Sequence, residues 1–123
     1  MMVFQPVSVI DIFAGPGWLS EGFARYPFQS ARSRDFEIKL SIEKDQHALR
    51  TLRLRSFFRH IKSRKGHRAY QRYMKGEIDI SKLYVCDEHA AEHARTEVFE
   101  SVLGEMPAIE VHTNIDRALD GST

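Results

Sequence analysis

The fold of this chain is decided by residues 7–17, which read Val-Ser-Val-Ile-Asp-Ile-Phe-Ala-Gly-Pro-Gly. The first part of this stretch is a short apolar run rich in β-branched side chains, which predicts a buried strand. The run stops abruptly at a turn that contains two glycines and a proline. Leu19 and Phe23 then follow at helical spacing, so we expect a helix that begins near Trp18 and ends before Pro27.

The next segments continue this alternation of strand and helix. Residues 36–43 alternate apolar and polar side chains, which predicts a second strand, and Asp45 suits the N-cap of a following helix. The order strand, glycine turn, helix, strand, helix begins a βαβ unit, so we predict an α/β fold with a parallel sheet. The remaining segments predicted along the chain are a helix break at 63–66, a short helix near 70–74, a helix over 88–103, a third strand over 108–111 and a helix from 115.

The composition limits the class of protein. The chain has 123 residues, of which 42% are hydrophobic, and this suits one globular domain rather than a disordered chain. Charged residues interrupt every apolar run well before the ~20 residues of a membrane span. The residues up to Pro6 lack the features of a secretory signal, and the single cysteine, Cys86, cannot form an internal disulfide. We therefore expect a cytoplasmic protein with no membrane segment.

The net charge of +1 conceals a strong asymmetry along the chain. Residues 50–75 carry ten basic and no acidic side chains, whereas residues 76–123 carry three basic and eleven acidic ones. Two interpretations stay open for the basic segment. It can be a solvated helix face partly balanced by the acidic third of the chain. It can also bind nucleic-acid phosphates, which would make the chain a non-catalytic nucleic-acid-binding or regulatory protein.

The glycine turn has the composition of a ligand-binding loop. Glycine lets the backbone approach a ligand and adopt φ values that a Cβ disfavours, and the helix that follows presents free N–H groups. An acid at the end of the next strand can accept hydrogen bonds from the hydroxyls of a ribose. Gly15 and Gly17 lie in the loop, and Glu43 ends the second strand. This arrangement predicts a nucleoside-type cofactor at the carboxyl edge of the sheet, with a purely structural turn as the alternative.

Two stretches around this loop resemble a known family. Residues 11–23, Asp-Ile-Phe-Ala-Gly-Pro-Gly-Trp-Leu-Ser-Glu-Gly-Phe, resemble the first motif of the DNA cytosine-5 methyltransferases, and residues 41–45, Ser-Ile-Glu-Lys-Asp, are similar to the second. The resemblance implies an incomplete Rossmann-like, S-adenosylmethionine-dependent methyltransferase fold with a truncated parallel sheet. Residues 1–123 would then form a single partial domain of an enzyme that methylates cytosine in DNA, as in restriction-modification.

The resemblance also implies roles for single residues, with S-adenosyl-L-methionine as the cofactor. Phe13 would pack against the adenine, the loop backbone would face the methionine part, and Glu43 would hold the ribose hydroxyls. Trp18 stands where the family has a second glycine, so its indole must either point away from the methionine part or obstruct it. The expected cofactor-binding residues are Asp11, Phe13, Ala14, Gly15, Pro16, Gly17, Leu19, Glu43 and Lys44.

The covalent chemistry of this family needs a cysteine in a Pro-Cys loop, which attacks a flipped-out cytosine. Cys86 follows Val85 instead of a proline, and in the family the Pro-Cys loop comes soon after the position of Thr123. We therefore expect the isolated chain to be inactive and to meet DNA through the complete enzyme. Exposed edges of a small sheet favour association, either with a second chain carrying the Pro-Cys loop and target-recognition region or as a homo-oligomer.

One further pattern is a candidate metal site. Residues 89–93, His-Ala-Ala-Glu-His, spell the H-x-x-E-H pattern of some zinc peptidases, and Cys86 lies three residues before them. A thiolate is a good zinc ligand, but the sequence shows no second-shell partner for these side chains. We therefore interpret the stretch as a solvated helix face and predict no resident metal.

Overall fold

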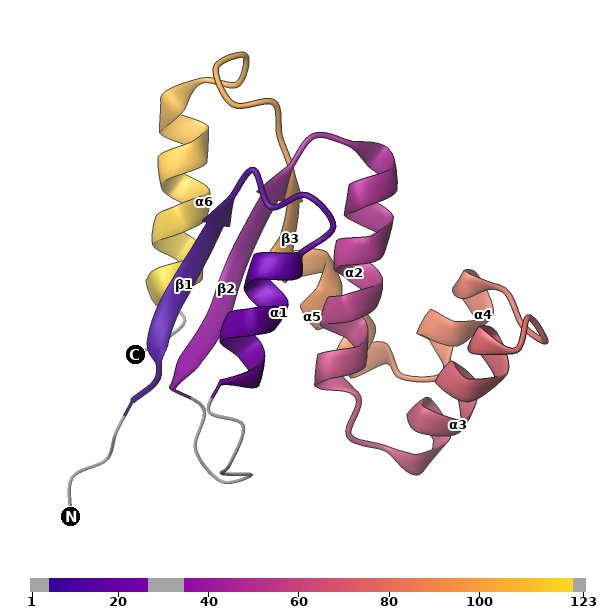
Figure 1. The fold of residues 1–123 in the computed structure, drawn as a ribbon. Coiled ribbons are helices and arrows are strands. Elements are labelled where there is room, and N and C mark those ends of the chain that lie inside the picture. Colours follow the sequence, from indigo (N-terminus) through magenta and orange to yellow (C-terminus); the bar gives the residue numbers. More distant parts are fainter. Residues whose placement is uncertain (1–4, 27–34, 121–123) are drawn as a thin grey trace.

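The computed structural model describes residues 5–26 and 35–120, and these residues form an α/β fold (Figure 1). Three parallel strands make one sheet in the order β1-β2-β3. They are β1 (Val7–Ile12), β2 (Phe36–Glu43) and β3 (Val98–Glu100). A small parallel sheet with helices on its faces is compatible with a Rossmann-like arrangement, so the α/β prediction is confirmed.

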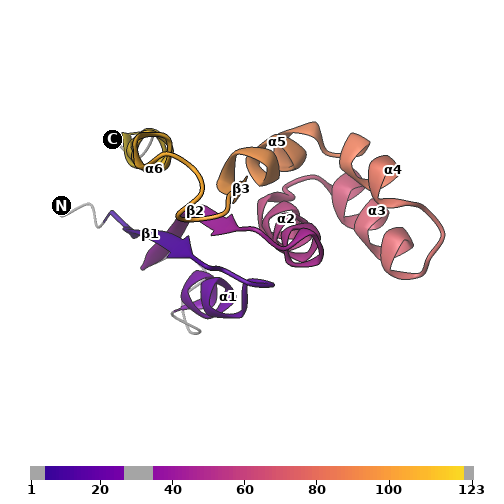
Figure 2. The ribbon, with the colours of Figure 1, turned by 90° about the horizontal axis from the view of Figure 1, so that it is seen from above.

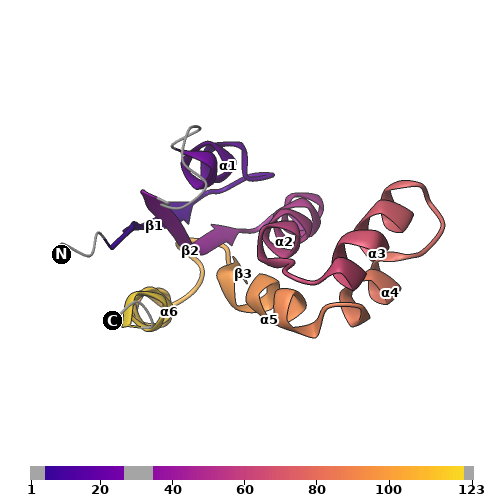
Figure 3. The ribbon, with the colours of Figure 1, turned by 90° about the horizontal axis from the view of Figure 1, so that it is seen from below.

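The helices are arranged in two groups. One helix, α1, lies on one face of the sheet and α6 lies on the other, whereas α3 and α4 lie far from the sheet, beyond α2 and α5 (Figures 2 and 3). Their bounds are α1 (Trp18–Arg25), α2 (Gln46–His60), α3 (Arg64–Met74), α4 (Ile80–Val85), α5 (Glu88–Glu97) and α6 (Ala108–Asp120). The proline predicted to end the first helix, Pro27, is outside the described residues.

Side-chain caps explain where several helices begin. The carboxylate of Asp45 accepts a hydrogen bond from the backbone N–H of Ala48 at 2.9 Å, as the sequence predicted for the start of α2. The hydroxyl of Ser63 accepts one from the N–H of Gly66 at 2.9 Å and starts α3. Each cap satisfies a helix N–H that has no partner within the helix.

Two separate apolar cores hold these elements, and α2 contributes to both. The sheet core lies under the glycine loop and contains Leu49, Leu52 and Val98, with Ala14 packed against them. The helical core joins the far end of α2 to α3, α4 and α5. Its buried members are Phe57, Ile61, Ala69, Leu83, Ala90, Ala91 and Ala94.

Three predictions about secondary structure were wrong in part. The helix expected over 88–103 ends at Glu97, because Val98 pairs with Ser41 of β2 and is buried at the sheet. The segment 108–111 begins α6 instead of forming a strand. The break expected at 63–66 occurs only before Arg64, since Gly66 is already inside α3.

None of the described helices has the length and apolar character that crossing a membrane requires. The longest, α2, has 15 residues and carries several arginines.

Candidate cofactor-binding site

The loop after β1 is held in an unusual backbone conformation. Phe13, Gly15 and Gly17 all have positive φ angles, of 59°, 56° and 88°. The N–H of Ala14 donates to the carbonyl of Ile42 at 3.0 Å, and the N–H of Gly17 donates to the carbonyl of Ala14 at 3.1 Å. The first of these bonds fixes the loop to β2 and the second closes its turn.

The two loop glycines are needed for different reasons. A Cβ on Gly17 would lie 2.8 Å from Cδ2 of Leu52, so this glycine allows α2 to approach the loop closely. A Cβ on Gly15 would meet no atom within 4 Å. The backbone at Gly15 therefore faces open space, and this space is available to a ligand that approaches the main chain.

Glu43 brings the end of β2 to this loop. Its Oε2 accepts a hydrogen bond from the N–H of Gly15 at 2.5 Å, across 28 positions in the sequence. Its Oε1 accepts bonds from the N–H groups of Lys44 at 2.8 Å and Asp45 at 3.1 Å. Burial acts to raise the pKa of the Glu43 carboxyl, but these three backbone hydrogen bonds outweigh burial, so its pKa lies below the ordinary value. The carboxylate is therefore ionised at neutral pH and aimed at the loop.

Asp11 has a different role in the structure from the loop residues. Its carboxylate is buried and accepts a hydrogen bond from the hydroxyl of Ser20, which is also buried in α1. This contact joins the end of β1 to the helix that follows the loop. Asp11 thus supports the loop from behind, and no pattern in the sequence indicated Ser20 as its partner.

The rim of the loop is apolar and exposed. The side chains of Phe13 and Trp18 are 74% and 73% exposed. The indole of Trp18 lies under the guanidinium of Arg55, whose central carbon is 4.4 Å from the ring centroid, a cation–π contact. The indole is therefore exposed beside Arg55 and does not fill the loop. Leu19, Pro16 and Lys44 are also exposed, and Leu19 lines an open apolar groove with Phe23 and Phe36.

A buried charge network lies behind α1 and was missed by the sequence analysis. The guanidinium of Arg59 donates to the carboxylate of Glu21 at 2.5 Å and also to that of Glu97. Glu97 also accepts a bond from the hydroxyl of Ser56 at 2.7 Å. The network joins α1, α2 and α5, so it is a structural device that positions the helices around the loop. The only sequence signal was the unusual run of charge itself.

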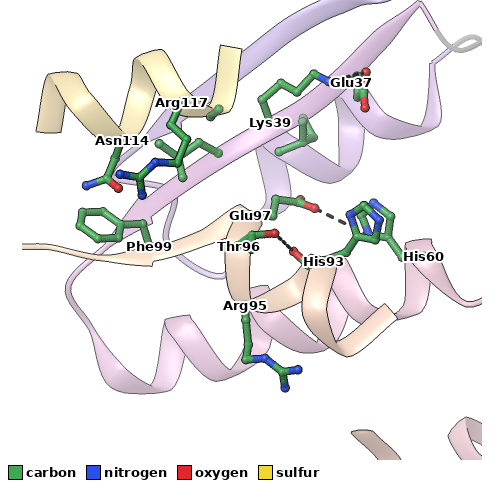
Figure 4. A pocket seen from close by; sticks show the side chains of 13 residues that line it. Glu37, Lys39, His60, His93, Arg95, Thr96, Glu97, Phe99, Asn114 and Arg117 are labelled. Carbon is green, nitrogen blue, oxygen red and sulfur yellow. Dashed lines mark hydrogen bonds and ion pairs between the residues drawn. The ribbon is translucent and has the colours of Figure 1, made fainter. Parts of the chain in front are cut away.

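A polar cavity of about 530 Å³ lies elsewhere, between β2, α5 and α6 (Figure 4). Its wall on β2 is residues 37–40, away from the carboxyl end of that strand. Several of its charges are already matched, since Lys39 pairs with Glu37 at 3.0 Å and Glu97 belongs to the network described above. Ligands of parallel sheets bind outside the carboxyl ends of the strands, so we assign the candidate site to the glycine loop.

The histidines of the H-x-x-E-H pattern pack against each other and against α2. The rings of His60 and His93 stack with centroids 4.4 Å apart, and the rings of His89 and His93 meet edge to face at 4.6 Å. Within residues 5–26 and 35–120, no group of three or more His, Cys, Asp or Glu side chains is arranged to hold a metal ion.

The geometry of the loop suits a ligand that carries both hydroxyl groups and a flat apolar ring. The structure brings together the main chain of residues 14–17, the carboxylate of Glu43 and the exposed ring of Phe13. It places Asp11 behind the loop, bonded to Ser20, and leaves Leu19, Pro16 and Lys44 exposed. A ribose has hydroxyl donors for an ionised carboxylate, and an aromatic base can stack on an exposed ring.

Comparison with known proteins supports a relation to methyltransferases. The chain is similar to a type II methyltransferase, M.Bpa9945I, of Bacillus paralicheniformis, with 34% identity over 67 residues. The similar region covers 54% of this chain and 13% of that relative, so the chain corresponds to a small part of the longer protein. No protein-family model and no solved structure matches the chain. The similarity indicates a methyltransferase-related segment.

Proposed function

We propose that this chain is the S-adenosylmethionine-binding, N-terminal part of a DNA cytosine-5 methyltransferase. The contact between Glu43 and the N–H of Gly15 carries the proposal, because it joins the two stretches that resemble the first and second motifs of that family. The similarity to a type II methyltransferase supports the same class. Such an enzyme would methylate cytosine in DNA as part of restriction-modification, and we propose the cytoplasm as its location.

Each residue of the loop has a task in this proposal. Glu43 would accept hydrogen bonds from the ribose, the main chain of residues 14–17 would face the methionine part, and Phe13 would pack on the adenine. S-adenosylmethionine, when bound, supplies an activated methyl group on its sulfonium sulfur. Lys44 and Leu19 would line the rim, and Asp11 would hold the loop through Ser20.

The acceptor capacity of Glu43 predicts a rearrangement when the cofactor binds. A carboxylate has about four acceptor positions, and three backbone N–H groups already occupy three of them. About one acceptor position therefore remains free, whereas two ribose hydroxyls need two. The N–H groups of Lys44 and Asp45 belong to the turn that starts α2, so the bond from Gly15 is the one we expect to be exchanged.

We propose further that this chain transfers no methyl group by itself. Cys86 is part-buried at the end of α4, where it packs against the helical core, so it is remote from the loop in the fold. A partner chain with the Pro-Cys loop and target-recognition region would complete the enzyme, and β1 offers it a free edge in the described sheet, where Val7 and Ile12 are exposed. A homo-oligomer through that edge is the other arrangement. A compact monomer in light scattering at micromolar concentration would contradict both.

The test of the proposed function is calorimetric titration with S-adenosylhomocysteine, which has the same nucleoside and lacks the reactive methyl group. We expect the unmodified chain to bind it and Glu43→Ala to lose at least about tenfold in affinity, because hydrogen bonds to a charged acceptor contribute ~1.5–3 kcal/mol.

Glu100→Gln is the matched control, since Glu100 ends the neighbouring strand β3 and bonds to the side chain of Gln46. This variant removes a carboxylate from the same edge of the sheet and should leave the affinity unchanged. An unmodified chain that binds no S-adenosylhomocysteine would refute the assignment of the cofactor. Equal losses in both variants would refute the role of Glu43.

A further inference from the structure

Helix α3 presents one side to the helical core and the other to solvent. Gly66 and Ala69 are buried, and Tyr70 and Tyr73 pack against the core. The helix lies at the end of the molecule farthest from β1 (Figures 1 and 3). Its outer side is therefore open and well separated from the glycine loop.

The structure divides the ten cations of residues 50–75 into three groups. Three are already engaged, because Arg59 binds Glu21 and Glu97, Arg72 pairs with Glu77 at 3.3 Å, and Arg55 stacks on Trp18. Two more, Arg50 and Arg53, lie on α2 and not on α3. The remaining five cations lie on or beside α3; within the described part of the chain they have no ion pair, and all are exposed. We call this group the α3 cationic face; it consists of Lys62, Arg64, Lys65, Arg68 and Lys75.

The charges of the α3 cationic face repel one another and the positive end of the helix dipole. The first turn of α3 contains no acidic residue and carries Arg64 and Lys65 at the positive end of the helix dipole. Arg64 and Arg68 are four residues apart, and Lys65 and Arg68 are three apart, so like charges are neighbours on the helix surface. The nearby carboxylate of Asp87 is engaged with Ser63 and with the start of α5. This arrangement becomes favourable when an external anion lies along the helix.

We infer that the α3 cationic face binds the phosphate backbone of duplex DNA. From Arg64 to Lys75 the helix rises about 16 Å, which spans several phosphates of a duplex that carries one charge per ~1.7 Å of its axis. The tyrosines of α3 pack inward, so the face has cations and no outward aromatic platform for unpaired bases. The contact is therefore with the backbone and independent of sequence. The choice of DNA as the polyanion rests on the proposed function.

The experiment measures binding of a short fluorescein-labelled DNA duplex by anisotropy from about 50 to 200 mM KCl, where counterion release makes affinity strongly salt-dependent. We expect steep salt dependence for the unmodified chain. In the variant R64Q/K65Q/R68Q the slope of log K against log salt should fall by about 0.9 for each lost contact, or about 2.7 in all.

The matched control is R25Q/R95Q/R117Q, which removes three exposed cations from α1, α5 and α6. It changes the net charge by the same amount and should leave the slope nearly unchanged. Equal effects of the two variants, or absent or salt-independent binding by the unmodified chain, would overturn the inference. Stronger binding to phosphatidylserine vesicles than to the duplex would also overturn it, in favour of a membrane surface.

Lysine acetylation of the unmodified chain gives a second measurement that needs no variant. Duplex DNA should protect Lys65 and Lys75, while Lys44 at the opposite end of α2 should react as before. Protection of Lys44 alone would contradict the inference. Binding of S-adenosylhomocysteine is measured separately. A chain that binds the duplex but not S-adenosylhomocysteine would refute the proposed function and support the role of the α3 cationic face. A chain that binds S-adenosylhomocysteine but not the duplex would support the proposed function and refute the role of the α3 cationic face.

Discussion

The region around the sheet and the region around α3 and α4 use their polar residues in opposite ways. At the sheet, a loop main chain and the carboxylate of Glu43 hydrogen-bond directly, and a buried bond between Asp11 and Ser20 supports them. In the helical region, an alanine-rich core lies inside and exposed cations lie outside. The first arrangement depends on distances of a few ångströms and suits a small ligand. The second depends on charge over the length of a helix and suits a polymer.

Helix α2 is the physical link between these regions. Leu49 and Leu52 near its start belong to the sheet core, and Phe57 near its end belongs to the helical core. Arg55, between these positions, stacks on Trp18 at the loop rim, and Arg59, just after Phe57, belongs to the charge network. The two regions therefore share one helix but have separate cores, and variants can test whether they also have separate functions.

The largest expected effect compares one leucine from each core. Leu49 and Leu83 are both fully buried, so Leu49→Ala and Leu83→Ala should each lower the free energy of unfolding by about 2–5 kcal/mol in urea denaturation. Leu49→Ala should also weaken S-adenosylhomocysteine binding, because its core lies under the glycine loop. Leu83→Ala should preserve that binding at temperatures where the variant is folded. Equal losses of affinity would show that the regions are not independent.

The charge network gives the next largest effect. Arg59→Met leaves the buried carboxylate of Glu97 without its cation, and breaking such a pair costs about 3 kcal/mol of stability. The double variant R59M/E97M should recover much of this loss, because it removes both charges. Arg95→Met is the control, since Arg95 pairs with Glu92 on an exposed helix face, and it should change the melting temperature little.

A smaller effect separates the two loop glycines. Gly17→Ala should cost about 2 kcal/mol, because the new Cβ combines a positive φ with a contact of 2.8 Å to Leu52. Gly15→Ala should cost about 1 kcal/mol from its φ alone, since the space around it is open. We expect Gly15→Ala to lower the free energy of cofactor binding by more than it lowers the free energy of unfolding. A larger stability loss at Gly15 than at Gly17 in thermal melts would contradict this comparison.

The smallest effect is a pH dependence in the helical region. Burial lowers the pKa of His93, and the nearby His60, His89 and Lys62 lower it further, against a weaker effect of Glu37. Because folding then favours the neutral imidazole, this contribution to stability is complete above the unfolded pKa of about 6.5 and is lost as pH falls through it. Unfolding at pH 7.5 and 5.5 should therefore differ less in His93→Gln than in the unmodified chain.

The sequence predicted the sheet region better than the helical region. The apolar run of β1, the alternation of β2 and the cap at Asp45 are local signals, and the structure confirms each of them. The short strand β3 carries no such signal, because Val98 and Phe99 also fit the apolar side of the helix before them. Only pairing with β2 decides that these residues are extended, and pairing across more than 50 positions is not visible in a local pattern.

The same distinction holds for the candidate site. The meeting of Glu43 with the loop followed from parallel strands whose carboxyl ends share one edge. The bond between Asp11 and Ser20, and the division of the cations into engaged and exposed ones, did not follow. Those features depend on which faces of α1, α2 and α5 meet. Net charge by segment predicted a basic surface, and only the fold shows that Arg59 is not part of it.

Phe13 combines a strained backbone with an exposed aromatic ring, so it lowers the stability of the loop while it offers a flat surface to a ligand. An L-residue with φ of 59° and a 74% exposed ring stores about 1–3 kcal/mol of backbone strain and gains little from burial. Phe13→Gly would relieve that strain and make the protein more robust, while removing the flat surface that the proposed nucleoside needs. Selection for thermal stability alone would therefore favour loss of this ring. Selection for a working binding site would retain it.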